Sequence, residues 1–276
     1  MVRIAVIADI HGNLPALRAV MADLERTAPD QVIVDGDLVG RGPQSREVLD
    51  IIAAAGWPVV QGNHEAFWVD CLQGHVPSDW DDGWWEPIRM ALGTISKELI
   101  DWMDALPTQH LVELPGAPTI QVVHGSPRRN NEGFYVLDSD ETILEVLNGT
   151  PYPVVLGAHT HVPLDRRVGN YRVLNPGSVG APFNHDPAAQ YMLLSWDGKD
   201  WQADLQRVGY DREETFRAWR ETGIWDAGIA AQVFGYELRT ASFHFWHYVR
   251  YCKENDLPLN NADSFASYRQ RANGHH

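Results

Sequence analysis

Short apolar runs alternate with amphipathic stretches over the first sixty residues of the chain. Three of these runs have the length and composition of buried strands, and they lie at residues 3–8, 31–34 and 59–61. Residues 14–21 and 45–55 carry apolar side chains at helical spacing, and Asn13 suits the N-cap position ahead of Pro15. This β-α-β-α-β order predicts a parallel sheet that is covered by helices.

The pattern changes after residue 65. Residues 65–110 are helical in spacing and rich in tryptophan, and we expect them to form a cap beside or over a site. Strand patterns return at residues 119–123, 154–156, 171–174, 191–196 and 201–208. The last two strands are expected to pair as an antiparallel hairpin through the turn at Asp197-Gly198. From residue 211 onward the chain is again helical in pattern and rich in aromatic side chains, and residues 273–276 are expected to be disordered.

Length and composition place the chain among globular α/β proteins. Its 276 residues are 44% hydrophobic and 21% charged, which suits one large domain or one domain with a small appendage. No run of about twenty apolar residues occurs, so we expect no membrane span. The first residues lead directly into a strand, from which we expect no signal peptide. Cys71 and Cys252 form neither a disulfide framework nor a metal-type spacing, which predicts a cytoplasmic location.

The net charge limits the partners that the chain can have. The chain carries 37 acidic and 22 basic residues, for a net charge of −15. Such a surface repels polyphosphate chains, so long nucleic acid is not an expected partner. A small phosphate ester must be attracted by local positive charge, and bound metal ions would supply it.

Five short polar motifs each follow an apolar run. They are Asp9-Ile10-His11, Gly36-Asp37, Gly62-Asn63-His64-Glu65, His124-Gly125 and Gly157-Ala158-His159-Thr160-His161. In open α/β sheets, sites form at the carboxyl ends of the strands, so these motifs are expected to meet there. Together they offer the oxygen and imidazole ligands needed for two divalent cations. Read singly, each motif has an ordinary structural interpretation, such as a helix cap or a turn.

Spacing within the motifs suggests how the ligands are arranged. Asp9 and His11 are two residues apart, as are His159 and His161, and in an extended segment such side chains point the same way. Asp37 is suited to bridge two cations with its two carboxylate oxygens. Neutral imidazole favours borderline transition metals over Mg²⁺ or Ca²⁺. We expect Glu65 to cap the following helix or to support its loop.

The motif series resembles the calcineurin-like metallophosphoesterase superfamily over residues 4–178. Asn175-Pro176-Gly177-Ser178 is similar to a short motif of the small bacterial phosphodiesterase branch. The resemblance implies an α/β fold in which a central β-sheet sandwich is flanked by helices in four layers. It also implies a metallophosphoesterase domain at residues 1–210, with a helical cap insertion at about 65–110. Residues 211–276 are expected to be a helical extension that packs on the same domain.

The resemblance also implies the roles of individual residues. One metal would be held by Asp9, His11, Asp37 and His161, and the second by Asp37, Asn63, His124 and His159. His64 would contact the scissile phosphate, and Arg41 falls on a phosphate-binding arginine of protein serine/threonine phosphatases and diadenosine tetraphosphatases. Gly40 stands where those phosphatases carry an aspartate that orients the catalytic histidine. Mn²⁺ is the preferred expectation for both metals, with Fe, Ni²⁺, Co²⁺ and Zn²⁺ as alternatives.

We therefore expect a binuclear metal-dependent phosphoesterase that attacks a small phosphate ester in line with a metal-bridging hydroxide. The motif at Asn175 favours a phosphodiester such as a cyclic nucleotide. The alternatives are a phosphomonoesterase or dinucleoside polyphosphate hydrolase, which Arg41-Gly42-Pro43 supports, and a protein phosphatase, which Gly40 disfavours. A non-catalytic scaffold has no need of the full ligand set.

Two questions stay open at the level of sequence. Cap residues Trp80, Trp84 and Trp85 either stack a nucleobase or fill a small core. The aromatic residues after 211 either pack against the sheet or form a surface for a homo-oligomer.

Overall fold

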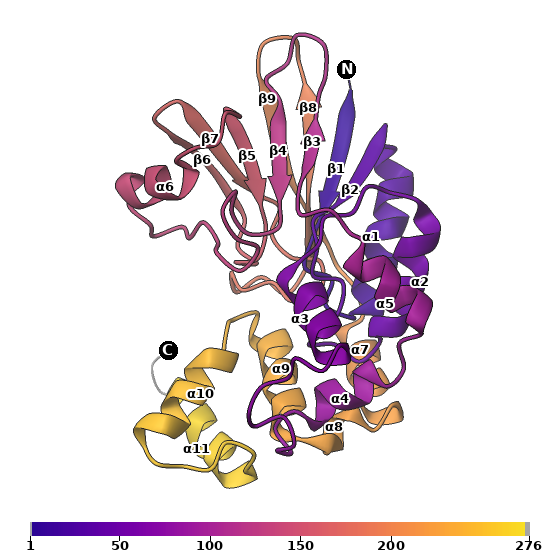
Figure 1. The fold of residues 1–276 in the computed structure, drawn as a ribbon, viewed down its shortest axis with the longest axis vertical. Helices are drawn as coiled ribbons and strands as arrows, with labels where there is room; N and C mark the ends of the chain where they lie inside the picture. The colour runs from indigo at the N-terminus through magenta and orange to yellow at the C-terminus, as the bar shows by residue number, and fades with distance from the viewer. Residues whose placement is uncertain (1, 274–276) are drawn as a thin grey trace.

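Two β-sheets face each other at the centre of the computed structural model, which describes residues 2–273 (Figure 1). The first sheet has the order β2 (Gln31–Val34), β1 (Arg3–Ile7), β8 (Ala189–Trp196) and β9 (Trp201–Val208). The second has the order β3 (His110–Val112), β4 (Ile120–Val123), β5 (Val154–Gly157), β7 (Tyr171–Asn175) and β6 (Leu164–Val168). Disorder was expected for residues 273–276. Asn273 is instead the last residue of helix α11 (Ala262–Asn273), and residues 274–276 lie outside the described residues.

Alternation along the strands creates the layers. In β1, Ile4 and Val6 pack into the core between the sheets, whereas Ala5 and Ile7 pack against helices on the outer face. In β5, Leu156 faces the inner core and Val155 packs on the outer side. Helices α1 (Leu14–Thr27) and α2 (Ser45–Ala55) cover the first sheet, and α6 (Asp140–Leu147) covers the second. The expected four-layer α/β sandwich is confirmed.

The sheet pairing differs from the single parallel sheet expected for the first half. Strand β1 pairs with β2 in parallel but with β8 antiparallel, and the expected β8–β9 hairpin is present. The expected strand at residues 59–61 was wrong, because only an isolated bridge joins Val34 to Val59. The amide of Gln61 already bonds to the carbonyl of Pro107, and α3 begins at Asn63, so the run is too short to continue pairing.

Local sequence signals set several element ends. The side chain of Asn13 accepts a hydrogen bond from the amide of Ala16 at 3.4 Å, as expected for the N-cap of α1. Helix α2 has the expected bounds and ends at Gly56 in the left-handed region. The edge strands β3 and β6 and the helix α6 were not expected from the sequence. Strand β3 has three residues, and β6 has three consecutive charged residues at its centre, so neither shows a clear strand pattern.

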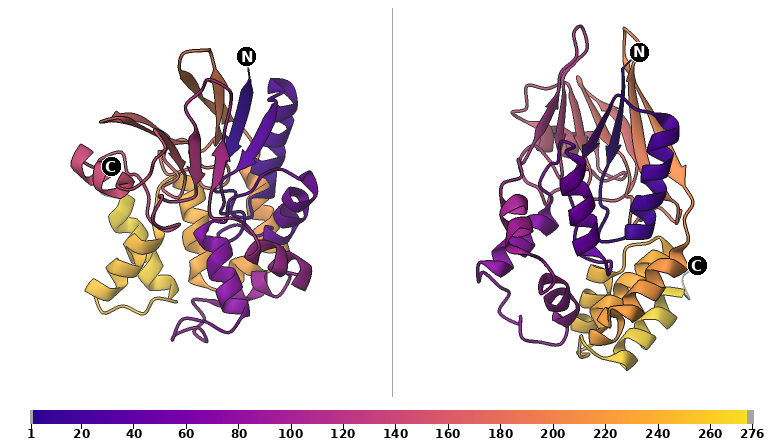
Figure 2. Two further views of the ribbon diagram at one scale, coloured as in Figure 1. Left: turned by 45° about the horizontal axis from the view of Figure 1, so that its top comes forward. Right: turned by 90° about the vertical axis from the view of Figure 1, so that its right-hand side faces the viewer.

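The cap and the C-terminal extension are helical and lie at the end of the molecule opposite the N-terminal strand tips (Figures 1 and 2). The cap contains α3 (Asn63–Leu72), α4 (Glu86–Leu92) and α5 (Lys97–Asp104). The extension contains α7 (Arg212–Glu221), α8 (Ile224–Ala227), α9 (Ile229–Thr240), α10 (Phe245–Glu254) and α11 (Ala262–Asn273). Both share one apolar core with α1 and α2. No helix within residues 2–273 combines the length and apolar character needed to cross a membrane.

Aromatic contacts join the cap to the extension. Trp84 is 3% exposed, and its ring lies 5.2 Å from that of Phe245 and 5.9 Å from that of Tyr248. Trp84 therefore fills a core, which settles for this residue the alternative that the sequence left open. Trp219 and Tyr248 of the extension are also buried, so most of the aromatic surface after residue 211 is used in packing. Trp246 differs, since it is 60% exposed.

Candidate metal centre

The five polar motifs converge where strands of both sheets end. The loops after β1 and β2 in the first sheet carry Asp9, His11 and Asp37. The loops after β4 and β5 in the second sheet carry His124 and the pair His159 and His161, and α3 begins at Asn63. The carboxyl ends of parallel strands from two sheets thus bring together side chains that are up to 152 residues apart, from 9 to 161 in the sequence.

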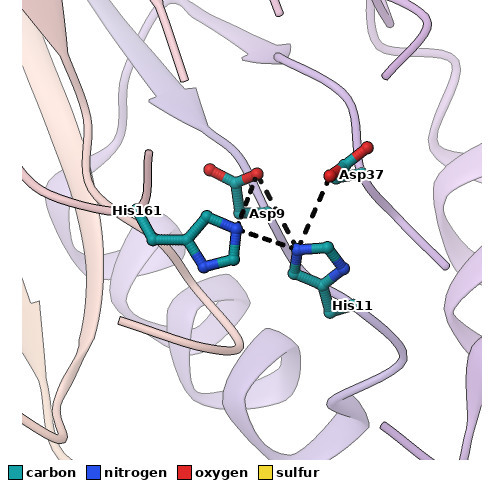
Figure 3. A group of neighbouring side chains, drawn as sticks. All are labelled: Asp9, His11, Asp37 and His161. Atoms are coloured by element: carbon teal, nitrogen blue, oxygen red, sulfur yellow. Dashed lines mark hydrogen bonds and ion pairs between the residues drawn. The ribbon is translucent and has the colours of Figure 1, made fainter. Parts of the chain in front are cut away.

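The first ligand group consists of Asp9, His11, Asp37 and His161, whose donor atoms all lie within 4.8 Å of one another (Figure 3). Nε2 of His11 is 3.0 Å from Nε2 of His161 and 3.6 Å from Oδ2 of Asp37. Nε2 of His161 is 3.4 Å from Oδ1 of Asp9. All four side chains point toward one common centre.

The second ligand group shares Asp37 with the first and adds His124 and His159. Nε2 of His124 is 3.3 Å from Oδ2 of Asp37. The amide oxygen of Asn63 lies 3.1 Å from Nε2 of His124 and 2.8 Å from Nδ1 of His159. The structure thus brings all seven predicted ligands together, and it divides them between two centres on either side of Asp37.

The backbone that presents these ligands is not extended. The ligand residues at 9, 11, 37, 159 and 161 have φ angles of 54°, 50°, 53°, 60° and 59°. The expectation that the D-x-H and H-x-H pairs use an extended segment was therefore wrong, because the strands end at Ile7 and Gly157, before the ligands begin. Left-handed conformations cost on the order of 1 kcal/mol or more for residues other than glycine, and such strain gathers at functional sites.

Three histidine rings are fixed by backbone carbonyls. Nδ1 of His11 lies 3.0 Å from the carbonyl of Val39, and Nδ1 of His124 lies 2.7 Å from that of Asp35. Nδ1 of His161 lies 2.5 Å from the carbonyl of Ala181. Since a carbonyl only accepts, each Nδ1 carries the proton, and each Nε2 keeps a lone pair for a metal.

Burial and mutual charge set the ionisation of the centre. Burial raises the pKa of Asp9 well above its usual value, and neither of its carboxylate oxygens has a hydrogen-bond partner among the described residues. Burial lowers the pKa of His11 and His161 well below the usual value. Burial opposes ionisation of Asp37 as well, but the charges of His124 and His64 hold its pKa well below the ordinary range.

These features fit divalent cations. A buried carboxylate without a hydrogen-bond partner is costly, and the imidazoles of His11 and His161, which the lowered pKa keeps neutral with free lone pairs, cannot satisfy it. Two cations between the groups would pair with Asp9 and Asp37 and would use the inward nitrogens. The mixed oxygen and nitrogen set also excludes a structural thiolate zinc site.

Glu65 holds the loop that carries Asp37. Its Oε2 accepts hydrogen bonds from the amides of Asp37 at 2.9 Å and Gly62 at 2.8 Å. Its Oε1 accepts from the amides of Leu38 at 2.7 Å and Val39 at 3.2 Å. Both parts of the expectation for Glu65 are met, since it caps α3 and supports the neighbouring loop.

His64 lies beside the ligand groups at the start of α3. Its Nε2 is 3.9 Å from Oδ2 of Asp37, and its side chain is 24% exposed. Burial lowers the pKa of His64 to about 4. A Cβ atom added at Gly40 would lie 2.3 Å from Nδ1 of His64, so any larger residue at this position would displace the ring. An orienting aspartate at residue 40 would therefore need the ring of His64 to move.

Arg41 reaches the site mouth but already has a partner. Its Nη1 donates to Oε2 of the buried Glu237 on α9. Its guanidinium lies 5.3, 5.4 and 5.8 Å from three ring centroids, those of Phe183, Phe234 and Phe243. Sequence reasoning missed Glu237. The available signal was an acidic residue at helical spacing from Val233 and Phe234, on the buried face of α9.

The motif at Asn175 links the ligand loops. Nδ2 of Asn175 donates to the carbonyl of Ala158 at 2.7 Å and to Oγ1 of Thr160 at 3.0 Å. Oγ of Ser178 donates to the carbonyl of Asp9 at 2.8 Å. The motif thereby connects the loop after β5 with the loop after β1. The remaining described histidines belong to neither ligand group, namely His75, His110, His185, His244 and His247.

Comparison with known proteins identifies the family. The profile of the calcineurin-like phosphoesterase superfamily domain matches residues 2–199. Uncharacterized protein MJ0912 of Methanocaldococcus jannaschii is 27% identical over 229 residues, which cover 77% of this chain and 90% of that protein. Phosphodiesterase YfcE of Escherichia coli is 25% identical over 194 residues, which cover 70% of this chain and 88% of YfcE.

A solved structure has the same arrangement of sheets and helices. A metallophosphoesterase from Sphaerobacter thermophilus is 25% identical and superposes with a TM-score of 0.69, covering 87% of this chain and 99% of its own. The matched residues 2–199 contain every predicted metal ligand together with Arg41 and His64. The chain belongs to the calcineurin-like phosphoesterase superfamily and is a metal-dependent phosphoric ester hydrolase.

Proposed function

We propose that this chain hydrolyses small phosphodiesters at a centre of two divalent metal ions that share Asp37. The observation that carries the proposal is the position of Asp37 between two ligand groups whose other donor atoms face it. When bound, two such cations supply Lewis-acid charge to the phosphate and acidify a water molecule for in-line attack. Mn²⁺ is the proposed metal, because the ligand set mixes carboxylates, an amide oxygen and imidazoles.

The residues of the chain have separate tasks in this proposal. Asp9, His11 and His161 hold one cation, and the groups of Asn63, His124 and His159 hold the other, while Asp37 contacts both. The hydrogen bonds from the histidine rings to backbone carbonyls, and those from backbone amides to Glu65, hold these ligands in place before the substrate arrives. This lowers the free-energy cost of ordering the site. No covalent nucleophile is needed.

Arg41 and His64 would act on the substrate. Arg41 is placed to bind a phosphate oxygen with its planar guanidinium, since it lines the same cavity as Asn63 and His159. His64 lines the adjoining cavity together with Arg41 and would hold or deliver a proton at the leaving oxygen. Burial lowers the pKa of His64 to about 4 in the metal-free protein, and the negative charge of a bound phosphate would favour its protonated form.

A diester is favoured over a monoester because space exists on two sides of the site. A cavity of about 600 Å³ adjoins Asn63 and His159, and a second of about 280 Å³ adjoins His64. A monoester would occupy one of them, whereas a diester has a group for each. The relative YfcE is named a phosphodiesterase, which agrees with this choice.

A substrate panel tests the proposal. Protein loaded with Mn²⁺ is assayed with bis(4-nitrophenyl) phosphate, 4-nitrophenyl phosphate, cyclic nucleotides and a dinucleoside polyphosphate, with Asp37→Asn as the inactive control. We expect kcat/KM to be highest for a diester. A higher kcat/KM for the monoester or the polyphosphate would contradict the proposal and would support a phosphomonoesterase or a dinucleoside polyphosphate hydrolase, respectively.

We propose that the protein is cytoplasmic. Cys71 and Cys252 are buried free thiols, which agrees with the cytoplasmic location expected from the sequence. A small phosphate ester is the proposed partner, and homo-oligomer formation stays a prediction.

A further inference from the structure

A narrow apolar cavity lies between the cap and the C-terminal extension, next to His64. Its volume is about 280 Å³. The cap contributes side chains from α3 and α4, and the extension contributes side chains from α9 and α10. The lining residues are Gly40, Arg41, His64, Phe67, Trp68, Trp85, Ile88, Phe234, Phe245 and Trp246.

This cavity opens onto the metal centre. It shares two lining residues, Arg41 and Trp246, with the larger cavity that contains Asn63 and His159. His64 forms its inner end, with Nε2 at 3.9 Å from Oδ2 of Asp37. A phosphate held between the ligand groups would therefore project one of its substituents past His64 into the narrow cavity.

The lining chemistry selects the kind of substituent. Two ionisable side chains, Arg41 and His64, lie at the end near the metals, and the other lining side chains are aromatic or aliphatic. The ring centroids of Phe67 and Trp85 are 5.9 Å apart on the cap side. On the extension side, Phe234 and Phe245 stack at 5.4 Å with an interplanar angle of 12°. Such flat walls suit a planar ring, since aromatic groups prefer offset-stacked and edge-to-face contacts.

Size narrows the choice further. A volume of about 280 Å³ is at the lower limit of ordinary ligand pockets, so a single ring system fits and a peptide or oligonucleotide does not.

We propose that this cavity binds a planar aromatic group esterified to the scissile phosphate, with Trp246 as its outer wall. The proposal rests on the proposed phosphoesterase function and adds the class of substrate. Phe234, Phe245 and Trp246 lie beyond residue 199, where the family match ends, so three of the ten lining residues belong to the extension of this chain. The ring of Trp246 stands edge-on to that of Phe245, with centroids 5.1 Å apart, and is 60% exposed, which leaves its outer face free to cover a ligand.

The test compares two phosphonates that cannot be hydrolysed. Phenylphosphonate and methylphosphonate place the same charged group at the metals and differ in the ring. Their Kd values are measured by titration calorimetry with the full chain loaded with Mn²⁺, for wild type, Trp246→Ala and Trp246→Phe. Leu137→Ala is the matched control, because Leu137 is 96% exposed and lines neither cavity.

We expect wild type to bind phenylphosphonate about tenfold more tightly than methylphosphonate, within the range known for stacking on aromatic side chains. Trp246→Ala should remove most of this preference and leave the Kd of methylphosphonate unchanged. Trp246→Phe should restore part of the preference, and Leu137→Ala should match wild type. Equal Kd values for the two phosphonates, no measurable binding of phenylphosphonate, or an unchanged preference in Trp246→Ala would overturn the proposal.

The outcome separates this proposal from the proposed function. If the protein hydrolyses bis(4-nitrophenyl) phosphate but binds both phosphonates equally, the proposal that the cavity binds an aromatic group is refuted and the proposed phosphodiesterase function is supported. If the protein prefers phenylphosphonate tenfold but hydrolyses no diester, the aromatic binding cavity is supported and the proposed function is refuted.

Discussion

Arg41, four residues after Asp37, forms an ion pair with Glu237 of the C-terminal extension. The other carboxylate oxygen of Glu237 accepts hydrogen bonds from the amides of His244 and Phe245, both at 2.7 Å. Glu237 thus joins the turn between α9 and α10 to an arginine at the mouth of the metal centre. The extension therefore does more than cover the sheet, because it orients a candidate substrate-binding side chain.

Loss of the Glu237 charge should destabilise the protein strongly. Glu237→Gln keeps the shape of the side chain and a hydrogen-bond acceptor but leaves Arg41 unpaired, with its side chain 13% exposed. Breaking a buried pair in this way costs about 3–5 kcal/mol in the free energy of unfolding. Glu213→Gln is the matched control, since its contact with Arg239 is exposed and 3.8 Å long, and such pairs contribute about 0–1 kcal/mol. Equal losses in urea denaturation would contradict this account.

Arg41 should contribute to substrate binding without holding metal. Arg41→Ala alone would leave Glu237 buried and unpaired, so the substitution is made in the Glu237→Gln background. Compared with that parent, we expect KM for phosphate esters to rise about tenfold or more, because a charge-assisted hydrogen bond is lost. Metal content should be unchanged. An unchanged KM would show that Arg41 is a purely structural partner of Glu237.

His64 should matter less than Asp37, and its effect should depend on the leaving group. Asp37→Ala removes a ligand common to both groups. His64→Ala is expected to lower kcat by about 10²–10⁴ for esters of poor leaving groups, the usual contribution of a general acid. The loss should shrink for nitrophenyl esters, because nitrophenolate leaves without a proton. The same loss across a series of leaving groups would eliminate the general-acid role.

Asp35 provides a test by pH in the metal-free protein. It is fully buried, and burial raises its pKa to about 7 from an unfolded value near 3.8, against the attraction of His124. A carboxyl with a raised folded pKa costs stability as the pH rises from 4 to 7, and the cost is complete above 7. Asp35→Asn does not titrate, so its stability relative to wild type should improve by roughly 2–3 kcal/mol between pH 5 and pH 8. A difference that does not vary with pH would show that Asp35 ionises normally.

The ligand positions could be predicted from sequence because each motif immediately follows a strand. Strand ends are fixed by apolar runs, so His124 and His159 could be placed near Asp9 without knowing which sheet holds them. The local geometry could not be predicted. An extended D-x-H segment and the observed left-handed one both bring Asp9 and His11 to one centre, and only backbone coordinates distinguish them.

Contacts between segments that are distant in the chain also could not be predicted from the sequence. Trp84 and Trp85 are neighbours in a tryptophan-rich loop, yet the first packs in the core against Tyr248 and the second lines the cavity beside His64. This difference depends on where the C-terminal extension packs. His244, the N-cap of helix α10 in that extension, lies 160 residues after Trp84 in the sequence. The prediction of a third strand at residues 59–61 was wrong for a similar reason, because the amide of Gln61 donates a hydrogen bond to the carbonyl of the distant Pro107.

The central claim is that two divalent cations share Asp37. The most direct measurement is anomalous diffraction from crystals soaked with Mn²⁺, with elemental analysis of the same protein in solution. We expect two manganese ions per chain, one bound by Asp9, His11 and His161 and one by Asn63, His124 and His159, with Asp37 in contact with both. A single ion, or two ions that do not share Asp37, would contradict it.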